Sequence, residues 1–366
     1  MNQFKGTRIV VTGSCGTVGS ELIRQLLQEP NGPSEVIGLD NNETALFFQD
    51  QQFLSEERAK FYQCDIRDHN DLQRHFEDAE IVFHTAALKH VILSERSPEQ
   101  VVQTNILGLQ NVIEASRSSG VKRVLFTSSD KAVNPTNVMG TSKLMGERLM
   151  TAANSHKRGT GPLFASTRFG NVLGSSGSVV PIFHNQIAKG GPVTLTNREM
   201  TRFVMSIQDA VRLVIDSSFL AQGGEVFITK MPVMRIEDLA KAMILELVPR
   251  YGFTPEQIVI QEIGTKPGEK LYEELMSQEE TRRAVELPNY FSVLPAFKGI
   301  YEDISYEYPE TSKKLVEDPY VSMKQLALSV TEIREFLQKN DLLSPPEDGN
   351  TSRYWPGDKE SLLQKP

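Results

Sequence analysis

Short, uninterrupted runs of branched apolar residues, separated by longer stretches of helical character, dominate the first half of the sequence. The runs lie at 8–12, 35–39, 81–85, 123–128 and 163–168. Continuous apolar character, without alternating polar positions, is typical of strands that are buried on both faces of a parallel sheet. The clearest helical stretches are 17–28, 98–118 and 140–157. This order predicts an α/β fold built on a Rossmann-like, doubly wound parallel sheet.

The regular pattern fades after Arg168, where prolines become frequent, although a helical stretch remains at 236–247. We therefore expect a smaller C-terminal region that binds substrate. The predicted organisation is a dinucleotide-binding domain with the catalytic segment at 1–170, a mainly substrate-binding region at 171–343, and a flexible tail at 344–366. Some elements of the second region are expected to return to the Rossmann sheet.

Composition restricts the partners of the chain. The formal net charge of -8, from 47 acidic and 39 basic side chains, leaves no broad basic surface for nucleic acid or anionic lipid. No run approaches the ~18 apolar residues of a membrane span, and the N-terminus lacks an apolar signal core. The two cysteines, Cys15 and Cys64, lack the spacing of a metal site. We expect a cytoplasmic protein that needs no metal, nucleic acid or membrane.

A glycine-rich segment, TGSCGTVG at 12–19, follows the first strand. Glycines in such a segment permit a tight turn and close approach of a pyrophosphate, and the next helix offers backbone N–H donors at its start. The spacing is one residue looser than the dinucleotide fingerprint, so an ordinary turn is the alternative. The predicted cofactor contacts here are Gly13, Ser14, Gly16, Thr17, Val18 and Gly19.

Asp40 ends the second strand, where a carboxylate can accept hydrogen bonds from both ribose hydroxyls of an adenosine. The same carboxylate repels a 2′-phosphate, which favours NAD over NADP. Asp65 and Ile66 follow a short strand and would lie near the adenine, with a solvated charged loop as the alternative. Ala86 and Ala87 would leave room for the cofactor backbone.

The strand at 123–128 leads into Ser129, Asp130 and Lys131, and a helix opens near Met139 and Lys143. This arrangement resembles extended short-chain dehydrogenases/reductases, which have Ser or Thr after this strand and Tyr-x-x-x-Lys at the helix start. Met139 occupies the tyrosine position. The run 128–140 (SSDKAVNPTNVMG) is similar to the bacterial polysaccharide-biosynthesis UDP-N-acetylglucosamine 4,6-dehydratases. Further similar stretches are 86–91, 168–172, 201–203 and 266–275.

The resemblance implies a specific reaction. Hydride leaves carbon 4 of UDP-N-acetylglucosamine for bound NAD, water is lost across carbons 5 and 6, and the hydride returns to carbon 6. It also implies that Asp130 is the acid, that Lys131 is the base, and that Lys143 serves both catalysis and cofactor binding. Because a thioether accepts no such proton, we expect Ser129, polarised by Lys143, to relay the carbon 4 hydroxyl proton to Asp130 or to water. The alternative for Asp130 and Lys131 is a surface ion pair, and that for Met139 is packing against the nicotinamide.

Four polar side chains in the similar stretches are predicted to bind the UDP-sugar: Lys89, Asn171, Arg202 and Lys270. Arg168 and Arg202 are equally suited to structural salt bridges, and His84 within an apolar run is expected to be a hydrogen-bonded core residue. Two other functions stay open, a UDP-hexose 4-epimerase and a non-catalytic NAD-binding regulator. The resemblance further implies a homo-oligomer.

Overall fold

The computed structural model of the chain describes residues 2–157, 159, 161–175, 178–265, 268–297, 304–308 and 316–344. The predicted tail beyond residue 344 and positions 266–267 of the similar stretch at 266–275 lie outside these residues. The chain forms two compact units. Unit 1 comprises Met1–Phe169, Gln208–Lys230 and Glu274–Pro319, and unit 2 comprises Gly170–Ile207, Met231–Glu273 and Tyr320–Pro366.

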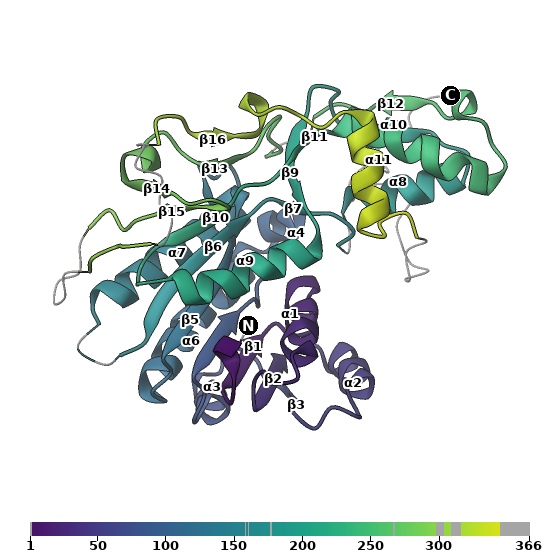
Figure 1. The fold of residues 1–366 in the computed structure, drawn as a ribbon. Coiled ribbons are helices and arrows are strands. Elements are labelled where there is room, and N and C mark those ends of the chain that lie inside the picture. The colour runs from purple at the N-terminus through teal and green to yellow at the C-terminus, as the bar shows by residue number, and fades with distance from the viewer. Residues whose placement is uncertain are drawn as a thin grey trace. The chain divides into compact units, whose positions relative to one another are not determined.

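Unit 1 is built on a nine-stranded sheet with the order β14-β15-β10-β6-β5-β4-β1-β2-β3 (Figure 1). The strands are β1 (Arg8–Thr12), β2 (Glu35–Asp40), β3 (Ala59–Gln63), β4 (Ile81–His84), β5 (Arg123–Ser129), β6 (Leu163–Phe169), β10 (Val226–Thr229), β14 (Ala284–Glu286) and β15 (Tyr290–Val293). Neighbours from β3 to β10 pair in parallel, whereas β15 is antiparallel to both β10 and β14. The predicted doubly wound parallel sheet is confirmed.

Helices cover this sheet. They are α1 (Thr17–Gln28), α2 (Glu43–Gln52), α3 (His69–Phe76), α4 (Val91–Arg96), α5 (Pro98–Val101), α6 (Gly108–Ser118), α7 (Val138–Ser155) and α9 (Ile207–Leu220). Side chains of α3, α6 and α7, such as Phe76, Val112 and Met150, share one apolar core with the sheet. In Figure 1, α1 and α9 lie on the side of the sheet that faces the viewer.

The predicted helix at 98–118 is confirmed, but it is not uniform. Between α5 and α6 the chain forms a π-helical turn, η2 (Val102–Leu107). Single π-helical turns within helices occur frequently at functional sites. One buried side chain of this turn, Asn105, belongs to the site described below.

Unit 2 contains α8 (Val179–Ala188), α10 (Ile236–Leu247), α11 (Val330–Lys339) and the strands β7 (Asn171–Val172), β8 (Val193–Leu195), β9 (Thr201–Met205), β11 (Val233–Arg235), β12 (Ile260–Glu262) and β16 (Tyr320–Val321). Strands β11, β9 and β7 form one small sheet, and β12 pairs with β8. Phe183, Leu239 and Ile333 from its three helices meet in one core. One further strand, β13 (Glu274–Met276), belongs to unit 1. The assignment of functions to the two units stays a prediction.

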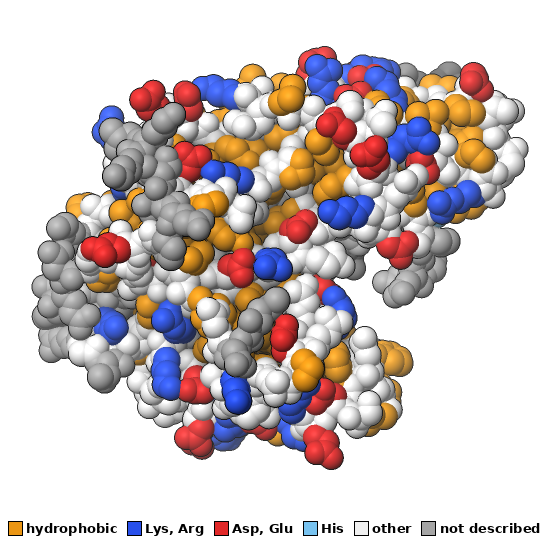
Figure 2. Space-filling model, viewed as in Figure 1, with side chains coloured by type: hydrophobic (Ala, Val, Ile, Leu, Met, Phe, Trp, Pro, Cys, Tyr) orange, Lys and Arg blue, Asp and Glu red, His pale blue; other side chains and the backbone are white. Residues whose placement is uncertain are grey.

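Charges are mixed on the surface. Figure 2 shows acidic and basic side chains interspersed over the drawn face of the described residues, without a broad basic area. In the part of the chain that the structure describes, no helix combines the length and the apolar character that crossing a membrane requires.

Candidate active site

The glycine-rich turn after β1 lies against the end of β4. Gly13 has a positive φ of 73°, and a Cβ atom there would lie 2.6 Å from the Cα atom of Ala86. A Cβ atom on Gly19, in α1, would lie 2.2 Å from the carbonyl oxygen of Gly13. Only glycine therefore fits at both positions, and the turn leads directly into α1, whose first turn, with Thr17 and Val18, offers backbone N–H donors. This geometry fits the phosphates of a dinucleotide.

Asp40 connects the end of β2 to this turn. Its Oδ2 atom accepts a hydrogen bond from the backbone N–H of Cys15 at 3.0 Å, and its Oδ1 atom accepts one from Asn42 at 3.0 Å. Gln49 of α2 donates to the carbonyl oxygen of Ser14 at 2.8 Å. Because a carboxylate has about four acceptor positions, Asp40 retains acceptor capacity for ribose hydroxyls.

A side chain of α6 binds the backbone of the loop after β3. Asn111 donates from Nδ2 to the carbonyl oxygens of Ile66 at 3.1 Å and Arg67 at 2.9 Å. Arg67 donates to both carboxylate oxygens of Asp65, which lowers the pKa of Asp65. Ile66 is buried. The sequence pattern had no signal for Asn111, because its role depends on a contact with a loop 44 residues away.

Ser129, Asp130 and Lys131 form a hydrogen-bonded chain where β5 ends and the short 3-10 helix η3 (Asp130–Ala132) begins. Ser129 donates from Oγ to Oδ1 of Asp130 at 2.6 Å. The Nζ atom of Lys131 lies 3.1 Å from both Oδ atoms of Asp130. Asp130 is only 4% exposed, so the alternative of an ordinary surface ion pair does not describe this carboxylate.

The start of α7 packs directly on this segment. Asn137 caps the helix by accepting the backbone N–H of Gly140 at 2.8 Å. A Cβ atom on Gly140 would lie 2.3 Å from the carbonyl oxygen of Lys131, which shows how closely the helix approaches η3. Met139, one residue earlier, is buried.

Lys143 lies one turn further along α7. It is buried, donates from Nζ to the carbonyl oxygen of Thr127 at 2.9 Å, and lies 4.8 Å from the ring centre of Phe126. Burial lowers the pKa of Lys143 to about 8. Its hydrogen-bond partner in the described residues is Thr127 rather than Ser129, so the expected polarisation of Ser129 by Lys143 is not a direct hydrogen bond.

His84 is a hydrogen-bonded core residue, as expected. Its Nδ1 atom lies 2.7 Å from Oγ1 of Thr12, and its ring stacks on Phe126. Burial, and secondarily the charge of Lys143, lowers the pKa of His84 to about 3, so the ring is neutral. Its Nε2 atom has no hydrogen-bond partner among the described residues.

Asn105 joins three elements of the site. Its Oδ1 atom accepts the backbone N–H of Leu88 at 2.8 Å, and its Nδ2 atom donates to the carbonyl oxygen of Leu88 at 3.0 Å and to Oγ of Ser142 at 2.9 Å. It thereby fixes the loop after β4, which carries the exposed Lys89, to α7. The sequence gives no signal for Asn105, because an asparagine inside a helical stretch forms no distinctive pattern.

Arg168 is a structural ion-pair residue of unit 1. It is 1% exposed, and its guanidinium contacts Glu147 of α7 at 2.6 Å and Glu280 at 2.8 Å. A further bond runs to the carbonyl oxygen of Leu275 at 3.0 Å. Burial alone would raise the pKa of Glu280, but the charge and the hydrogen bonds of Arg168 lower it to about 2. Both carboxylates were missed, because they lie 21 and 112 residues from Arg168.

Two of the residues predicted to bind substrate meet in unit 2 at Glu273. Asn171 donates to Oε1 of Glu273 at 2.8 Å, and Nε of Arg202 lies 3.2 Å from the same atom. Arg202 also donates to the carbonyl oxygen of Lys270 at 2.9 Å. These contacts support the structural role of Arg202, the alternative to substrate binding. Lys89, the fourth residue that the sequence predicts to bind substrate, belongs to unit 1. The substrate role of all four residues stays a prediction.

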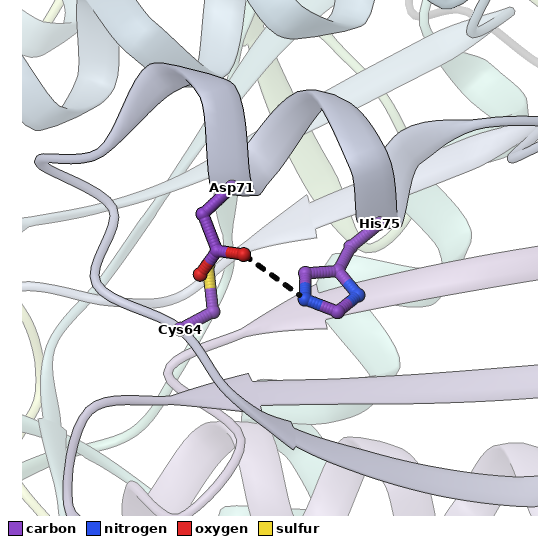
Figure 3. A group of neighbouring side chains, drawn as sticks. All are labelled: Cys64, Asp71 and His75. Atoms are coloured by element: carbon purple, nitrogen blue, oxygen red, sulfur yellow. Dashed lines mark ion pairs between the residues drawn. The ribbon is translucent and has the colours of Figure 1, made fainter.

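Cys64, Asp71 and His75 form a small polar cluster beside β3 (Figure 3). Asp71 lies 3.5 Å from Nε2 of His75 and 2.7 Å from Arg74. Burial is the main cause that raises the pKa of the Cys64 thiol, and the hydrogen bond between Cys64 and Asp71 raises it further. The guanidinium of Arg74 places a positive charge at the oxygen that a metal cation would need. We therefore interpret the cluster as polar contacts around Asp71, whose ion-pair partner is Arg74.

The sequence matches the protein family described as "Polysaccharide biosynthesis protein" over residues 9–295. An uncharacterized membrane protein of Methanocaldococcus jannaschii is 48% identical over 80% of this chain and 87% of its own length. A UDP-N-acetylglucosamine 4,6-dehydratase (inverting) of Campylobacter jejuni is 35% identical over 85% of this chain and 90% of its own length. A UDP-glucose 4-epimerase of Rickettsia bellii is 36% identical over 92% and 97%, respectively.

Solved structures share the fold. The X-ray structure of Pen from Bacillus thuringiensis matches with a TM-score of 0.84 and 38% identity, over 93% of this chain and 99% of that chain. DesIV of Streptomyces venezuelae, a dTDP-glucose 4,6-dehydratase solved with NAD and TYD bound, has a TM-score of 0.63 and 24% identity over 72% and 87%. At this identity, DesIV shows the likeness of fold alone.

Proposed function

The chain belongs to the polysaccharide biosynthesis protein family, and from this membership we propose that it is an NAD-dependent nucleotide-sugar enzyme, specifically a UDP-N-acetylglucosamine 4,6-dehydratase. Its relatives include nucleotide-sugar dehydratases and epimerases. The observation that carries the proposal is the hydrogen-bonded chain of Ser129, Asp130 and Lys131 at the carboxyl end of β5. Removal of water across carbons 5 and 6 requires an acid for the leaving hydroxide and a base for the carbon 5 proton, and Asp130 and Lys131 can supply them.

The residues of unit 1 suit NAD. The glycine turn leads into the N-terminus of α1, whose backbone N–H groups suit a pyrophosphate, and Asp40 supplies the acceptor for ribose hydroxyls. DesIV, which shares the fold, was solved with NAD. Bound NAD would take the hydride from carbon 4 of the sugar and return it to carbon 6, so that no net oxidation occurs.

The protons of this reaction can be assigned to side chains. Ser129 receives the proton of the carbon 4 hydroxyl while its own proton passes to Asp130, across the 2.6 Å hydrogen bond. Asp130 then gives that proton to the hydroxide that leaves carbon 6, which forms water. Lys131 removes the proton from carbon 5 and later returns one there. The proton count closes, because the hydroxyl proton from carbon 4 ends in the water.

Lys131 can act as a base only as a neutral amine. While Asp130 is ionised, their 3.1 Å contact stabilises the ammonium form of Lys131. Protonation of Asp130 by the relay removes that anionic partner, and with it the stabilisation of the ammonium form of Lys131, whose side chain is 33% exposed. In this scheme Met139 packs and takes no proton.

The test is a proton NMR time course of the purified protein with UDP-N-acetylglucosamine in deuterated water. We expect a new methyl signal, deuterium at carbon 5, and ring couplings that report whether carbon 5 is retained or inverted. No methyl signal, with or without added NAD, would refute the dehydratase. Ser129→Ala is expected to lower kcat by about 10²-fold, the scale of a lost proton-transfer group; full activity would refute the relay.

A UDP-hexose 4-epimerase is the second candidate, because the Rickettsia bellii relative is as similar as the dehydratase. An epimerase transfers the hydride back to carbon 4 and has no need of an acid and a base for carbons 5 and 6. It would therefore give an inverted carbon 4 without a methyl signal. In the dehydratase, Asp130→Asn abolishes release of water. A regulator without catalysis would give neither product. That the protein forms a homo-oligomer stays a prediction.

A further inference from the structure

Three buried side chains of α7 lie four residues apart, at Met139, Lys143 and Glu147, and thus share one face of the helix. The last two bind consecutive residues of β5. Lys143 donates to the carbonyl oxygen of Thr127 at 2.9 Å, and Ser128 donates from Oγ to Oε1 of Glu147 at 2.5 Å. Together these bonds fix the position of α7 along β5.

Glu147 itself is held by Arg168. The guanidinium donates from Nε to Oε1 of Glu147 at 2.7 Å and from Nη2 to Oε2 at 2.6 Å, so the carboxylate is bound in the two-pronged geometry. The remaining donors of Arg168 reach Glu280 and the carbonyl oxygen of Leu275. A carboxylate that is 3% exposed and bound at both oxygens has little freedom to reorient.

We propose that Glu147 is a positioning residue that fixes Ser129, Asp130 and Lys131 through its bond with Ser128, an inference that rests on the proposed dehydratase function. Ser128 precedes this segment directly in the chain. A displacement of the strand end by 1 Å would move Asp130 and Lys131 relative to carbons 5 and 6. Misplacement on this scale can cost about 10²-fold in rate.

Glu147 also acts on the charge of its neighbour. Burial lowers the pKa of Lys143, and the negative charge of Glu147, one helical turn away, raises it again in part. On the side of β4, the group that faces Lys143 is His84, which is neutral. Neutralising Glu147 should therefore lower the pKa of Lys143 further, a change that loss of packing alone would not produce.

Two variants and two controls separate positioning from general stability. Ser128→Ala removes the hydrogen bond and keeps the ion pair, whereas Glu147→Gln removes the charge and keeps the shape. Glu280→Gln is the matched control, because Glu280 binds the same Arg168 but, among the described residues, makes no hydrogen bond with Ser128. Ser116→Ala, in α6, removes another buried serine hydroxyl, which bonds to Val112.

The first measurement is hydrogen–deuterium exchange of the backbone amides of residues 127–132, with thermal unfolding of each variant alongside. This readout needs neither substrate nor turnover, so it tests positioning even where the proposed reaction fails. We expect faster exchange in Ser128→Ala and Glu147→Gln and wild-type exchange in the two controls. Equal exchange in Ser128→Ala, Glu280→Gln and the wild type would overturn the inference.

The second measurement is the rate of dehydration. Ser128→Ala and Glu147→Gln should lose about 10 to 10²-fold in kcat with KM within about twofold, because the geometry of the reacting groups changes while the sugar-binding groups do not. Glu147→Gln should also move the high-pH limb of the rate profile to lower pH. The positioning role would be contradicted if both variants had a kcat within about threefold of the kcat of Glu280→Gln. It would also be contradicted if the high-pH limb of the Glu147→Gln rate profile did not move.

Discussion

Gly140→Ala probes the closest contact between α7 and the catalytic segment. A Cβ atom at this position would lie 2.3 Å from the carbonyl oxygen of Lys131, whereas ordinary contact begins at 3.4 Å. Either the first turn of α7 or the backbone of Lys131 must therefore move by about 1 Å. Both the backbone carbonyl of Lys131 and the capped helix start are fixed groups, so a change of one flexible side chain cannot absorb the clash.

The effect on stability should be modest. Overpacking costs roughly 1–3 kcal/mol, and alanine favours a helix over glycine by about 0.8–1 kcal/mol, which leaves a net loss of roughly 0–2 kcal/mol. The melting temperature should then fall by at most about 8 °C. Activity should fall further, by about 10²-fold in kcat, because the displacement acts on Lys131 itself.

The assay pairs thermal unfolding with the NMR measurement of dehydration. Thr141→Ala serves as the control, because it lies on the same turn, is exposed, and loses only its bond to the carbonyl oxygen of Asn137. An activity of Gly140→Ala within about threefold of Thr141→Ala, at an unchanged melting temperature, would show that α7 does not fix Lys131, and the reasoning would be refuted.

Lys143→Met should raise the free energy of unfolding at pH 7 by up to about 3 kcal/mol while abolishing activity, because the pKa of Lys143 falls from 10.5 to about 8. Between pH 8 and 10.5 the unfolded wild-type chain keeps a proton on Lys143 that the folded chain has lost, so the stability of the wild type rises with pH. The stability advantage of Lys143→Met over the wild type should therefore shrink as the pH rises. Melting curves from pH 7 to 10.5 in which this advantage grows would contradict the argument. Asp40→Asn leaves one of two backbone N–H groups without its acceptor, and calorimetry should show NAD binding at least about tenfold weaker; unchanged affinity would remove Asp40 from the cofactor site. Thr12→Val removes the partner of the His84 ring, and urea unfolding should show a loss of about 1–3 kcal/mol; a stability equal to wild type would show that this bond contributes nothing.

The fold was readable from the sequence where local pattern decides it. Strands β1, β4 and β5 are buried on both faces and therefore appear as continuous apolar runs. The helix at 98–118 was equally clear, but its π-helical turn was not, because one widened turn hardly changes the spacing of apolar residues. The pairing of β10 with β6, and of β15 with β10, depends on contacts that no local pattern encodes.

The candidate site shows the same division. Ser129, Asp130, Lys131 and Lys143 could be proposed because they sit close together in the chain, beside a strand end. The groups that hold them could not. Glu147 reads as an ordinary polar position of a helix, and its role appears only when Arg168 and Ser128 meet it in the fold.

The order of the strands has a consequence for the chain as it leaves the ribosome. Strand β6 is complete at Phe169, yet its parallel partner β10 starts only at Val226, after a segment of unit 2 has been made. At synthesis rates of about 5–20 residues per second, the open edge of β6 waits for roughly 3–11 s. During that interval the nascent sheet presents an unpaired edge to other chains. Truncations that end before Val226 should therefore aggregate, and occupancy of chaperones on the nascent chain should be highest between these two strands.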